Sequence, residues 1–420
     1  MSKIRLHGSS SGYVEIAPAA AASNNTLTAP STVGEIIAKA AAGAIGVTSM
    51  KASNVNVGAA VTITESGIEA SGIGITCANI NGTQIGGRRN LVINGAMTVA
   101  QRGTSSTSNG YQTVDRYNMN SSGHDEAPTQ SQADVSSGTS PYAEGFRKSL
   151  KITNGNQTSG AGAADRLRIL YIIEAQDMAN SGWNYTDSNS KVTLSFWIKS
   201  SVAQNFYFRA TTSDGTSQNF PMETGALTAN TWTKITKTIP GNSNLQFDNN
   251  NGIGFYLIFA LMRGTDNTDS GVALNTWAAT SSGTTIFPDY TSTWYTTNDA
   301  TFEITGVQLE VGSQATAFEH LSFGDDLSLC QRYYEIAEGG WQGPVYATDS
   351  DIKINIPFKV TKRANPTLAT ISTDENCCSS ASVTANIFDQ TLGARVVGNN
   401  VFNDGANRFF HAKFSADSEL

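Results

Sequence analysis

Short runs of alternating apolar and polar residues recur between residues 90 and 323, separated by turns rich in Asn, Gly, Ser and Asp. Residues 192–198 alternate cleanly, as a strand with one buried face does. Residues 253–261 are apolar almost throughout, which is typical of a central strand. The runs predict strands at Leu91–Ile93, Ser149–Ile152, Leu167–Ile173, Val192–Ile198, Phe206–Ala210, Trp232–Ile239, Gly254–Met262 and Phe302–Leu309. About eight antiparallel strands in one long domain favour a jelly-roll β-sandwich over residues 90–323.

The stretch over residues 302–334 indicates where this sandwich ends. It starts as an alternating strand in which Gly306 marks a bulge or a close approach of the backbone. Two adjacent carboxylates, Asp325 and Asp326, then open a helical pattern, and the positive end of a helix favours them there. We therefore expect a hinge into a second domain, residues 324–420.

Alternation is weaker in this second domain. Strands are predicted at Lys353–Val360, Ser382–Phe388 and Arg408–Phe414. A domain of this size has little interior of its own, so we expect a small β-rich knob that depends on neighbours for burial.

Residues 49–89 carry β-branched residues, many at alternate positions, in very short runs broken by glycine. The apolar positions are Val55, Val57, Val61, Ile63, Ile68, Ile73, Ile75, Ile80 and Ile85. One copy of such a ribbon cannot cover its own apolar side. Either its turns stack into a solenoid, or several chains wind around a common axis, or the segment is a flexible linker. We favour a wound β shaft because β-branched alternation is costly to leave exposed.

Residues 1–48 predict a small attachment module. Ile4 and Leu6 suit pairing with Tyr13–Ile16 across a glycine-rich turn, and a short helix begins near Ser31. Neither element can bury its apolar side alone, so we expect other chains to complete both, the helix in a bundle of three.

Several motifs follow one another in a fixed order through residues 89–336. They are RNLVINGAM from Arg89, AQRG from Ala100, VDRY from Val114, IEAQDMA from Ile173, LSFWIKSS from Leu194, ITGVQLEVGSQATAFEH from Ile304 and LCQRYYEI from Leu329. Together they resemble a β-sandwich found in bacteriophage tail fibres and related virion proteins, a domain similar to carbohydrate-binding modules.

The resemblance implies a homotrimeric virion protein of the phage tail, assembled in the host cytoplasm. Its N-terminal region would attach to other tail or virion proteins. It would adhere to a host-surface receptor, a glycan or a protein, by multivalent binding without catalysis. The alternatives are a purely structural component, such as a head fibre, baseplate part or connector spacer, and, behind it, a glycan depolymerase.

The amino-acid composition limits the classes of partner that the protein can bind. The net charge of −8 argues against a nucleic acid or an anionic membrane surface, which need a positive field. No run of about 18 apolar residues predicts a membrane span, and the basic start is not followed by the apolar core of a signal peptide. The four cysteines show no metal-binding spacing and are expected to be reduced thiols.

Enzyme signatures are weak, and we expect no catalysis. No nucleophile, zinc or phosphate-loop motif is present. A glycan-cleaving enzyme would need two carboxylates, but each candidate pair has a structural explanation. The pairs are Asp325/Asp326, Asp266/Asp269 and Glu174/Asp177. His320, beside Glu319, is similarly expected to be structural.

Two kinds of binding residue are candidates. A structural Ca²⁺ is the one cofactor left open, with Asp125, Glu126, Glu303 and Glu310 as oxygen donors, although solvated carboxylates explain them as well. Aromatic rings in polar loops suit stacking on sugar C–H faces, while packing under a loop or at a subunit contact is the alternative. These rings belong to Trp183, Tyr185, Trp277, Tyr290, Trp294 and Tyr295.

Overall fold

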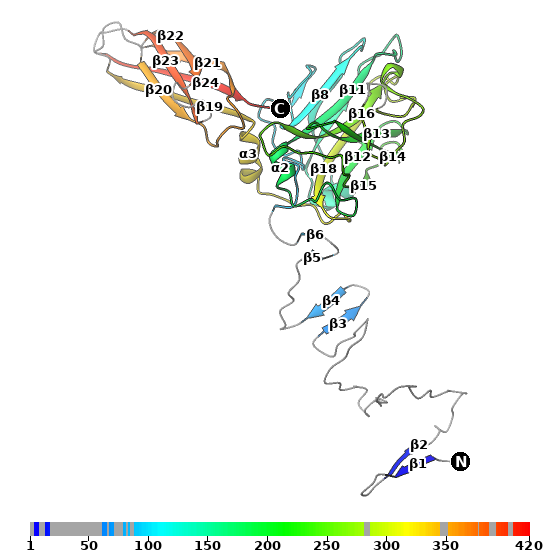
Figure 1. The fold of residues 1–420 in the computed structure, drawn as a ribbon. Coiled ribbons are helices and arrows are strands. Elements are labelled where there is room, and N and C mark those ends of the chain that lie inside the picture. The colour runs from blue at the N-terminus through cyan, green and yellow to red at the C-terminus, as the bar shows by residue number, and fades with distance from the viewer. Residues whose placement is uncertain are drawn as a thin grey trace. The chain divides into compact units, whose positions relative to one another are not determined.

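We describe the protein from a computed structural model, which is mainly β, as predicted (Figure 1). The structure describes residues 4–7, 13–16, 61–64, 67–70, 79–80, 83–84, 88–280, 286–344, 352–376, 378–385, 392–401 and 406–420. The chain divides into two compact units, Met1–Cys77 and Ala78–Leu420.

The strands described before residue 88 form three small antiparallel pairs. In the first unit, β1 (Ile4–His7) pairs with β2 (Tyr13–Ile16) in the predicted way, and β3 (Val61–Thr64) pairs with β4 (Gly67–Ala70). In the second unit, β5 (Asn79–Ile80) pairs with β6 (Thr83–Gln84). The predicted helix near Ser31 and much of the predicted shaft lie outside the described residues, so the trimer stays a prediction.

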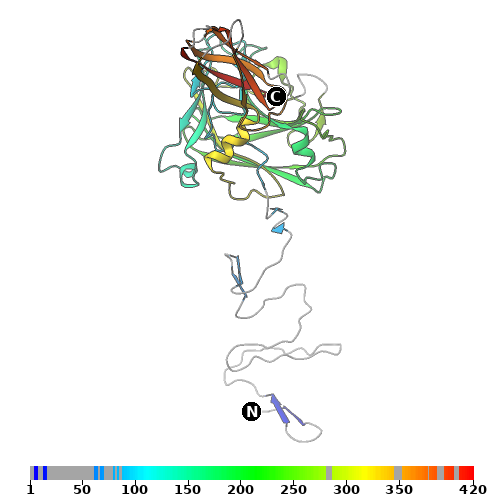
Figure 2. The same cartoon turned by 90° about the vertical axis from the view of Figure 1, so that its left-hand side faces the viewer.

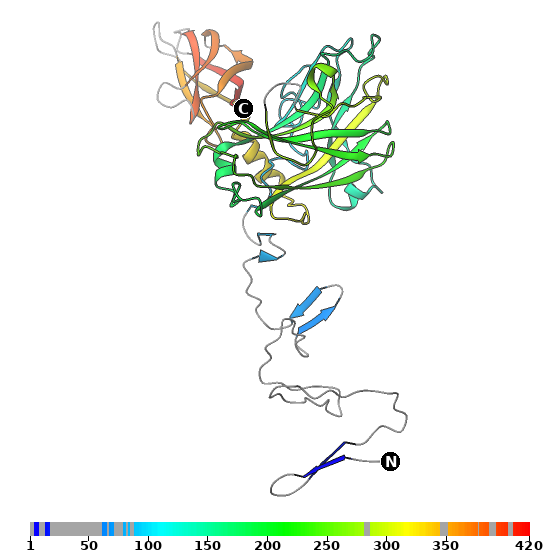
Figure 3. The ribbon, with the colours of Figure 1, turned by 45° about the vertical axis from the view of Figure 1, so that its right-hand side comes forward.

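Two six-stranded antiparallel sheets form the sandwich, which confirms the predicted fold class. Sheet A, in the order β15-β12-β18-β10-β9-β7, contains β7 (Ser105–Ser106), β9 (Thr129–Asp134), β10 (Lys148–Thr153), β12 (Lys191–Ser200), β15 (Thr233–Pro240) and β18 (Thr301–Val311). Sheet B, in the order β17-β14-β13-β16-β11-β8, contains β8 (Tyr117–Ser122), β11 (Arg166–Glu174), β13 (Asn205–Thr212), β14 (Gln218–Ala226), β16 (Ile253–Arg263) and β17 (Ala278–Ala279). Figure 3 shows the long strands of both sheets in cyan to yellow.

Aromatic residues from both sheets fill the core between them. The ring of Phe196 on sheet A meets the rings of Phe208 and Phe259 on sheet B edge-on, at centroid distances of 5.2 and 5.1 Å. β16 lies between β13 and β11, so the prediction that residues 253–261 are central is confirmed. Gly306 has a φ of 64° and approaches Phe146 so closely that a Cβ there would lie 2.6 Å from the ring.

The first predicted sandwich strand, Leu91–Ile93, is wrong because this segment forms a turn. The Asn90 side-chain oxygen accepts hydrogen bonds from the amides of Val92 (2.9 Å) and Leu309 (3.0 Å). Asn94 has the left-handed conformation, with a φ of 57°, and its side-chain oxygen accepts a hydrogen bond from the amide of Val99. Side-chain amides thus satisfy backbone groups that a second strand would have paired.

The described helices are short. They are α1 (Ser140–Ala143), α2 (Ala175–Ala179), the 3₁₀ helix η1 (Thr265–Asn267) and α3 (Phe323–Gln331). The helix predicted near Asp325 is confirmed as α3, and the Ser322 side chain caps it by accepting the Asp325 amide at 3.2 Å. Within the described part of the chain, no helix is long and apolar enough to cross a membrane.

The segment after α3 forms two three-stranded antiparallel sheets, drawn in orange and red in Figure 2. One has the order β19-β24-β21 and the other β20-β23-β22. Their strands are β19 (Tyr334–Pro344), β20 (Ile352–Pro357), β21 (Thr367–Glu375), β22 (Cys378–Ala385), β23 (Gly393–Val401) and β24 (Asn407–Asp417). The three strands predicted here overlap β20, β22 and β24. A small cluster around Phe410 and Phe414 forms the core, and Cys330 and Cys378 are both buried.

Candidate functional site

The outer face of sheet B, which we call the B face, carries aromatic, basic and amide side chains. Phe206 and Phe208 of β13 point into the core, so strand alternation directs Tyr207 and Arg209 outward. The same argument applied to β8, β11 and β16 defines the B face as Asn118, Asn120, Arg166, Arg168, Leu170, Tyr207, Arg209, Tyr256, Ile258, Ala260 and Arg263. Tyr207, Arg168 and Tyr256 are partly exposed.

Strand register arranges these side chains in rows across three neighbouring strands. Tyr207 on β13 and Arg168 on β11 both pair with Ala260 on the strand between them. Arg209 pairs with Ile258 in the next row. The row therefore places the ring of Tyr207 and the guanidinium group of Arg168 on either side of small, buried Ala260.

The arginines of the B face lie close enough to repel one another. Burial lowers the pKa of Arg209 to about 9, and repulsion from Arg263 and Arg168 adds to the effect. Burial and repulsion from Arg263 and Arg166 lower the pKa of Arg168 to about 10. Both groups therefore stay positively charged at neutral pH.

Three of the six aromatic candidates are buried, which contradicts their proposed role in sugar stacking. Trp183, Trp294 and Tyr295 are 3%, 0% and 1% exposed and belong to the sandwich core. Their polar flanking residues run over the surface while the rings turn inward. No face of these rings is open to a sugar.

The other three candidates are partly exposed but packed. The Tyr185 ring lies edge-on to Phe247 at 4.8 Å. Trp277 donates its indole N–H to the carbonyl oxygen of Pro240 at 2.7 Å. Tyr290 packs against Tyr207 with ring centroids 4.8 Å apart, so it borders the B face.

The calcium candidates do not come together. Glu126 accepts the amide of Asn156 at 2.7 Å, and Glu303 pairs with Lys199 at 2.8 Å. Glu310 accepts the hydroxyl of Thr316 at 2.6 Å. Asp125 accepts the amide of Ser159 at 2.7 Å. Among the residues that the structure describes, no group of three or more His, Cys, Asp or Glu side chains is placed to hold a metal ion.

Two of the three carboxylate pairs considered for catalysis are held by tight structural contacts. Glu174 forms two hydrogen bonds with Arg332, at 2.8 and 2.9 Å. Burial opposes the charge of Glu174, but Arg332 holds its pKa below the usual value. The Asp326 side chain accepts the amide of Asn94 at 2.9 Å.

One member of the third pair, Asp269, and the histidine also have local partners. Asp269 accepts the amide of Gly271 at 2.7 Å, and Asp266 lies in the first turn of η1. His320 contacts the carbonyl oxygen of Glu144 through its Nε2 atom at 2.8 Å.

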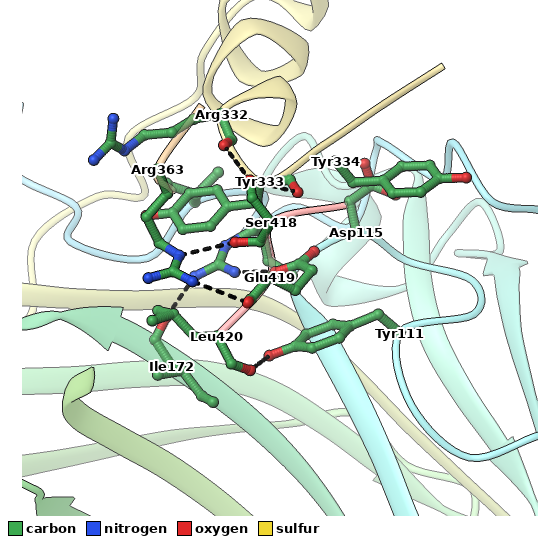
Figure 4. A network of polar contacts seen from close by, with 12 residues as sticks. Tyr111, Asp115, Ile172, Arg332, Tyr333, Tyr334, Arg363, Ser418, Glu419 and Leu420 are labelled. Carbon is green, nitrogen blue, oxygen red and sulfur yellow. Dashed lines mark hydrogen bonds and ion pairs between the residues drawn. The ribbon is translucent and has the colours of Figure 1, made fainter. Parts of the chain in front are cut away.

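The motifs AQRG, VDRY and LCQRYYEI meet at a buried polar cluster, and Figure 4 shows the part of it around Tyr333, Ser418 and Glu419. We call it the joint, because it ties the sandwich to α3, β19 and residues 417–420. Arg116 forms an ion pair with Glu419 and donates to the carbonyl oxygen of Ile172 at 2.6 Å. Its guanidinium carbon lies 3.4 Å from the ring centroid of Tyr333.

A second arginine and a loop residue extend the joint. Arg102 pairs with Asp417 at 3.0 Å and lies over the ring of Tyr334 at 3.5 Å. Gln101 donates through its side chain to Asp115 and to the carbonyl oxygen of Tyr334, at 2.5 and 2.7 Å. Tyr333 and Tyr334, at the end of the predicted hinge segment, are therefore held against the sandwich by contacts with Arg116, Arg102 and Gln101.

Asp115 should make the stability of the protein depend on pH. Burial raises its pKa from 3.8 to about 6, more than the hydrogen bonds from Gln101 lower it. Because the folded-state pKa lies above the unfolded one, the stability that the protonated carboxyl group contributes is complete below the unfolded pKa and is lost as pH rises through the folded pKa. We expect the free energy of unfolding of the wild type, relative to Asp115→Asn, to fall by up to about 3 kcal/mol over this range.

Urea unfolding of both proteins at several pH values would measure this difference. Asp134→Asn, on an exposed side chain of sheet A, is the matched control. A difference between wild type and Asp115→Asn that stays constant from acid to neutral pH would contradict the expectation.

Comparison with known proteins leaves the family open. No family model matches the chain, and no curated protein matches it. Among solved structures, an arabinose-bound α-L-arabinofuranosidase has a TM-score of 0.29 at 11% identity, covering 56% of this chain and 27% of the other. A tailspike protein of bacteriophage CBA120 has a TM-score of 0.28 at 8% identity, covering 53% and 21%. A family 11 carbohydrate-binding module from Clostridium thermocellum has a TM-score of 0.23 at 14% identity, covering 52% and 98%.

This chain thus spans about a quarter of the length of the first two proteins. With TM-scores this low, these structures do not indicate what the chain does. Its function must be inferred from its own residues.

Proposed function

We propose that this chain is a homotrimeric virion protein of the bacteriophage tail-fibre type that adheres to a host-surface glycan through the B face, without catalysis. It assembles in the host cytoplasm and attaches to the particle through its N-terminal region. The observation that carries the binding role is the juxtaposition of partly exposed Tyr207 and Tyr256 with amide and guanidinium groups on one face. Aromatic rings bind the C–H faces of sugars, and the polar groups bind hydroxyls.

Three further features support this proposal. The ordered motifs of residues 89–336 resemble phage fibre sandwiches. A shallow face gives weak binding per copy, which several copies on one fibre would multiply. Four of the six carboxylates considered for hydrolysis, Glu174, Asp269, Asp325 and Asp326, have structural partners, such as Arg332 for Glu174, which favours binding over cleavage.

A purely structural role in the virion is the second candidate, and the joint favours it. The hydrogen bonds and ion pairs between the sandwich and the segment after it would suit a spacer that transmits force. This role requires no ligand on the B face, so a binding measurement separates the two candidates.

The test is binding of the full-length protein to an array of bacterial surface polysaccharides. We expect at least one polysaccharide to bind, and the double variant Tyr207→Ala/Tyr256→Ala to weaken binding by roughly tenfold for each ring. Tyr142→Ala, in α1 on the outer side of sheet A, is the matched control and should leave binding intact. Absence of binding by the wild type would favour the structural role, whereas full binding by the double variant would show that the glycan binds elsewhere than on the B face. Light scattering would distinguish a trimer from a monomer.

A further inference from the structure

Four arginines of the B face form a group of positive charges. Arg166 lies opposite Arg263 where β11 pairs with β16. Arg168 and Arg209 lie on the two strands that flank β16. The guanidinium carbons of Arg209 and Arg263 are each 5.7 Å from the ring centroid of buried Phe287, which places both groups against one ring.

These arginines contact neutral side-chain amides. Arg209 donates to Asn219 at 2.8 Å, and Arg168 donates to Asn120 at 3.1 Å. Arg263 makes a long contact of 3.4 Å with Asn267. Over the described part of the chain, none of the four forms an ion pair with a carboxylate.

Some of this donor capacity is unused and buried. The Nε atoms of Arg166, Arg209 and Arg263 are buried and have no hydrogen-bond partner. Arg209 and Arg263 are 7% and 4% exposed, whereas Arg166 and Arg168 are partly exposed. The two exposed groups can therefore meet a ligand directly, while the two buried groups strengthen the positive field beneath it.

Among the residues that the structure describes, the other two buried cations are paired with carboxylates. Arg116 pairs with Glu419, and Lys362 pairs with Glu335 at 2.6 Å. A buried charge without a counter-charge is costly, and an arginine does not escape the cost by losing its proton at neutral pH. The B-face arginines thus lack the negative partner that the fold supplies elsewhere.

We propose that the B face binds an acidic glycan, whose carboxylate, sulfate or phosphate groups pair with Arg166 and Arg168 in the field of Arg209 and Arg263. This inference rests on the proposed glycan binding and names the chemical class of the glycan. Guanidinium groups match such anions with two parallel hydrogen bonds. A glycan is named rather than a nucleic acid because the inference rests on the proposed glycan binding, and single-stranded DNA is the competing polyanion in the test.

Matched polymers test the charge requirement with full-length protein. Dextran sulfate is compared with dextran, and polygalacturonate with its methyl ester, by affinity electrophoresis. We expect the acidic member of at least one pair to bind about tenfold or more tightly than its neutral counterpart, and the advantage to shrink at high ionic strength. The pair that responds distinguishes sulfate from carboxylate recognition.

Two double variants assign the effect to this face. Arg166→Gln/Arg168→Gln should lose about tenfold in affinity for the acidic polymer. Lys151→Gln/Lys191→Gln removes the same charge from sheet A and should lose little. Equal losses in both double variants, or none in the arginine variant, would overturn the inference. So would equally tight binding of single-stranded DNA.

The outcomes also separate this inference from the proposed function. Neutral and acidic polymers that bind equally well, in a manner that depends on Tyr207 and Tyr256, would remove only the acidic specificity. Binding of no polymer and no bacterial polysaccharide would remove both.

Discussion

Replacing Glu419 by alanine is expected to destabilise the protein by about 3–5 kcal/mol, because it leaves buried Arg116 without its counter-charge. The side chains of Arg116 and Glu419 are 1% and 5% exposed, so water can replace little of the lost interaction. Burial works against the charge of Arg116, yet Glu419 keeps its pKa well above the usual value. The Glu419→Ala variant would therefore keep a charged guanidinium group in an apolar setting of tyrosine rings.

Urea unfolding of the full-length protein would measure this loss, and a double variant tests its cause. Replacing both members in Arg116→Met/Glu419→Met should recover most of the stability, since apolar side chains of similar size do not need a counter-charge. Lys148→Ala, which breaks the exposed pair with Asp134, should cost less than about 1 kcal/mol. A Glu419→Ala loss as small as that of Lys148→Ala, or a double variant less stable than Glu419→Ala, would mean that the pair does not hold the joint.

The joint explains why the motif residues could be recognised in the sequence before their role could be. Gln101, Arg102, Asp115 and Arg116 lie in loops or turns far from residue 419 in the sequence. Their charges look solvated in a linear reading. Only the fold brings them to Tyr333 and the residues after β24, where burial turns ordinary polar residues into a connected cluster.

The pattern of apolar residues was sufficient to predict the central strands, but it could not predict strands composed mainly of polar residues. β16 was predicted because it is apolar almost throughout, and β18 because its apolar residues alternate with polar ones; both lie inside sheets. β8, β9 and β14 were missed. In β8 the inward positions are Tyr117, Met119 and Ser121, so the pattern depends on only two apolar side chains. A strand of this kind is fixed by its backbone pairing with β11, which no local pattern reveals.

The candidate site was missed for a related reason. The search for sugar-binding rings favoured aromatic residues in polar loops, and these loops proved to direct half of their rings inward. The useful signal was Arg166 and Arg168, two charges at alternate positions on a strand whose other face is apolar. Recognising the full group required the register that aligns β11, β16 and β13, because Arg209 and Arg263 come from other parts of the sequence.

Trp294 provides the sharpest test of this correction, because burial and sugar stacking predict opposite results for one substitution. Its side chain is 0% exposed and packs near Phe206, with ring centroids 6.5 Å apart. Trp294→Ala should therefore lower the free energy of unfolding by about 3–5 kcal/mol, through lost burial and the cavity left behind. Glycan affinity, corrected for the folded fraction, should not change.

Tyr207→Ala is the natural counterpart, since its ring is partly exposed on the B face. It should change stability far less and weaken glycan binding by roughly tenfold. Urea unfolding would measure the free energy of unfolding of both variants, and affinity electrophoresis would measure their affinity for the glycan. If Trp294→Ala were as stable as Tyr207→Ala and abolished binding, the indole ring would have to reach the ligand, and the loop around it would have to open. The sugar would then be bound at the loops that the sequence first suggested, rather than on the sheet.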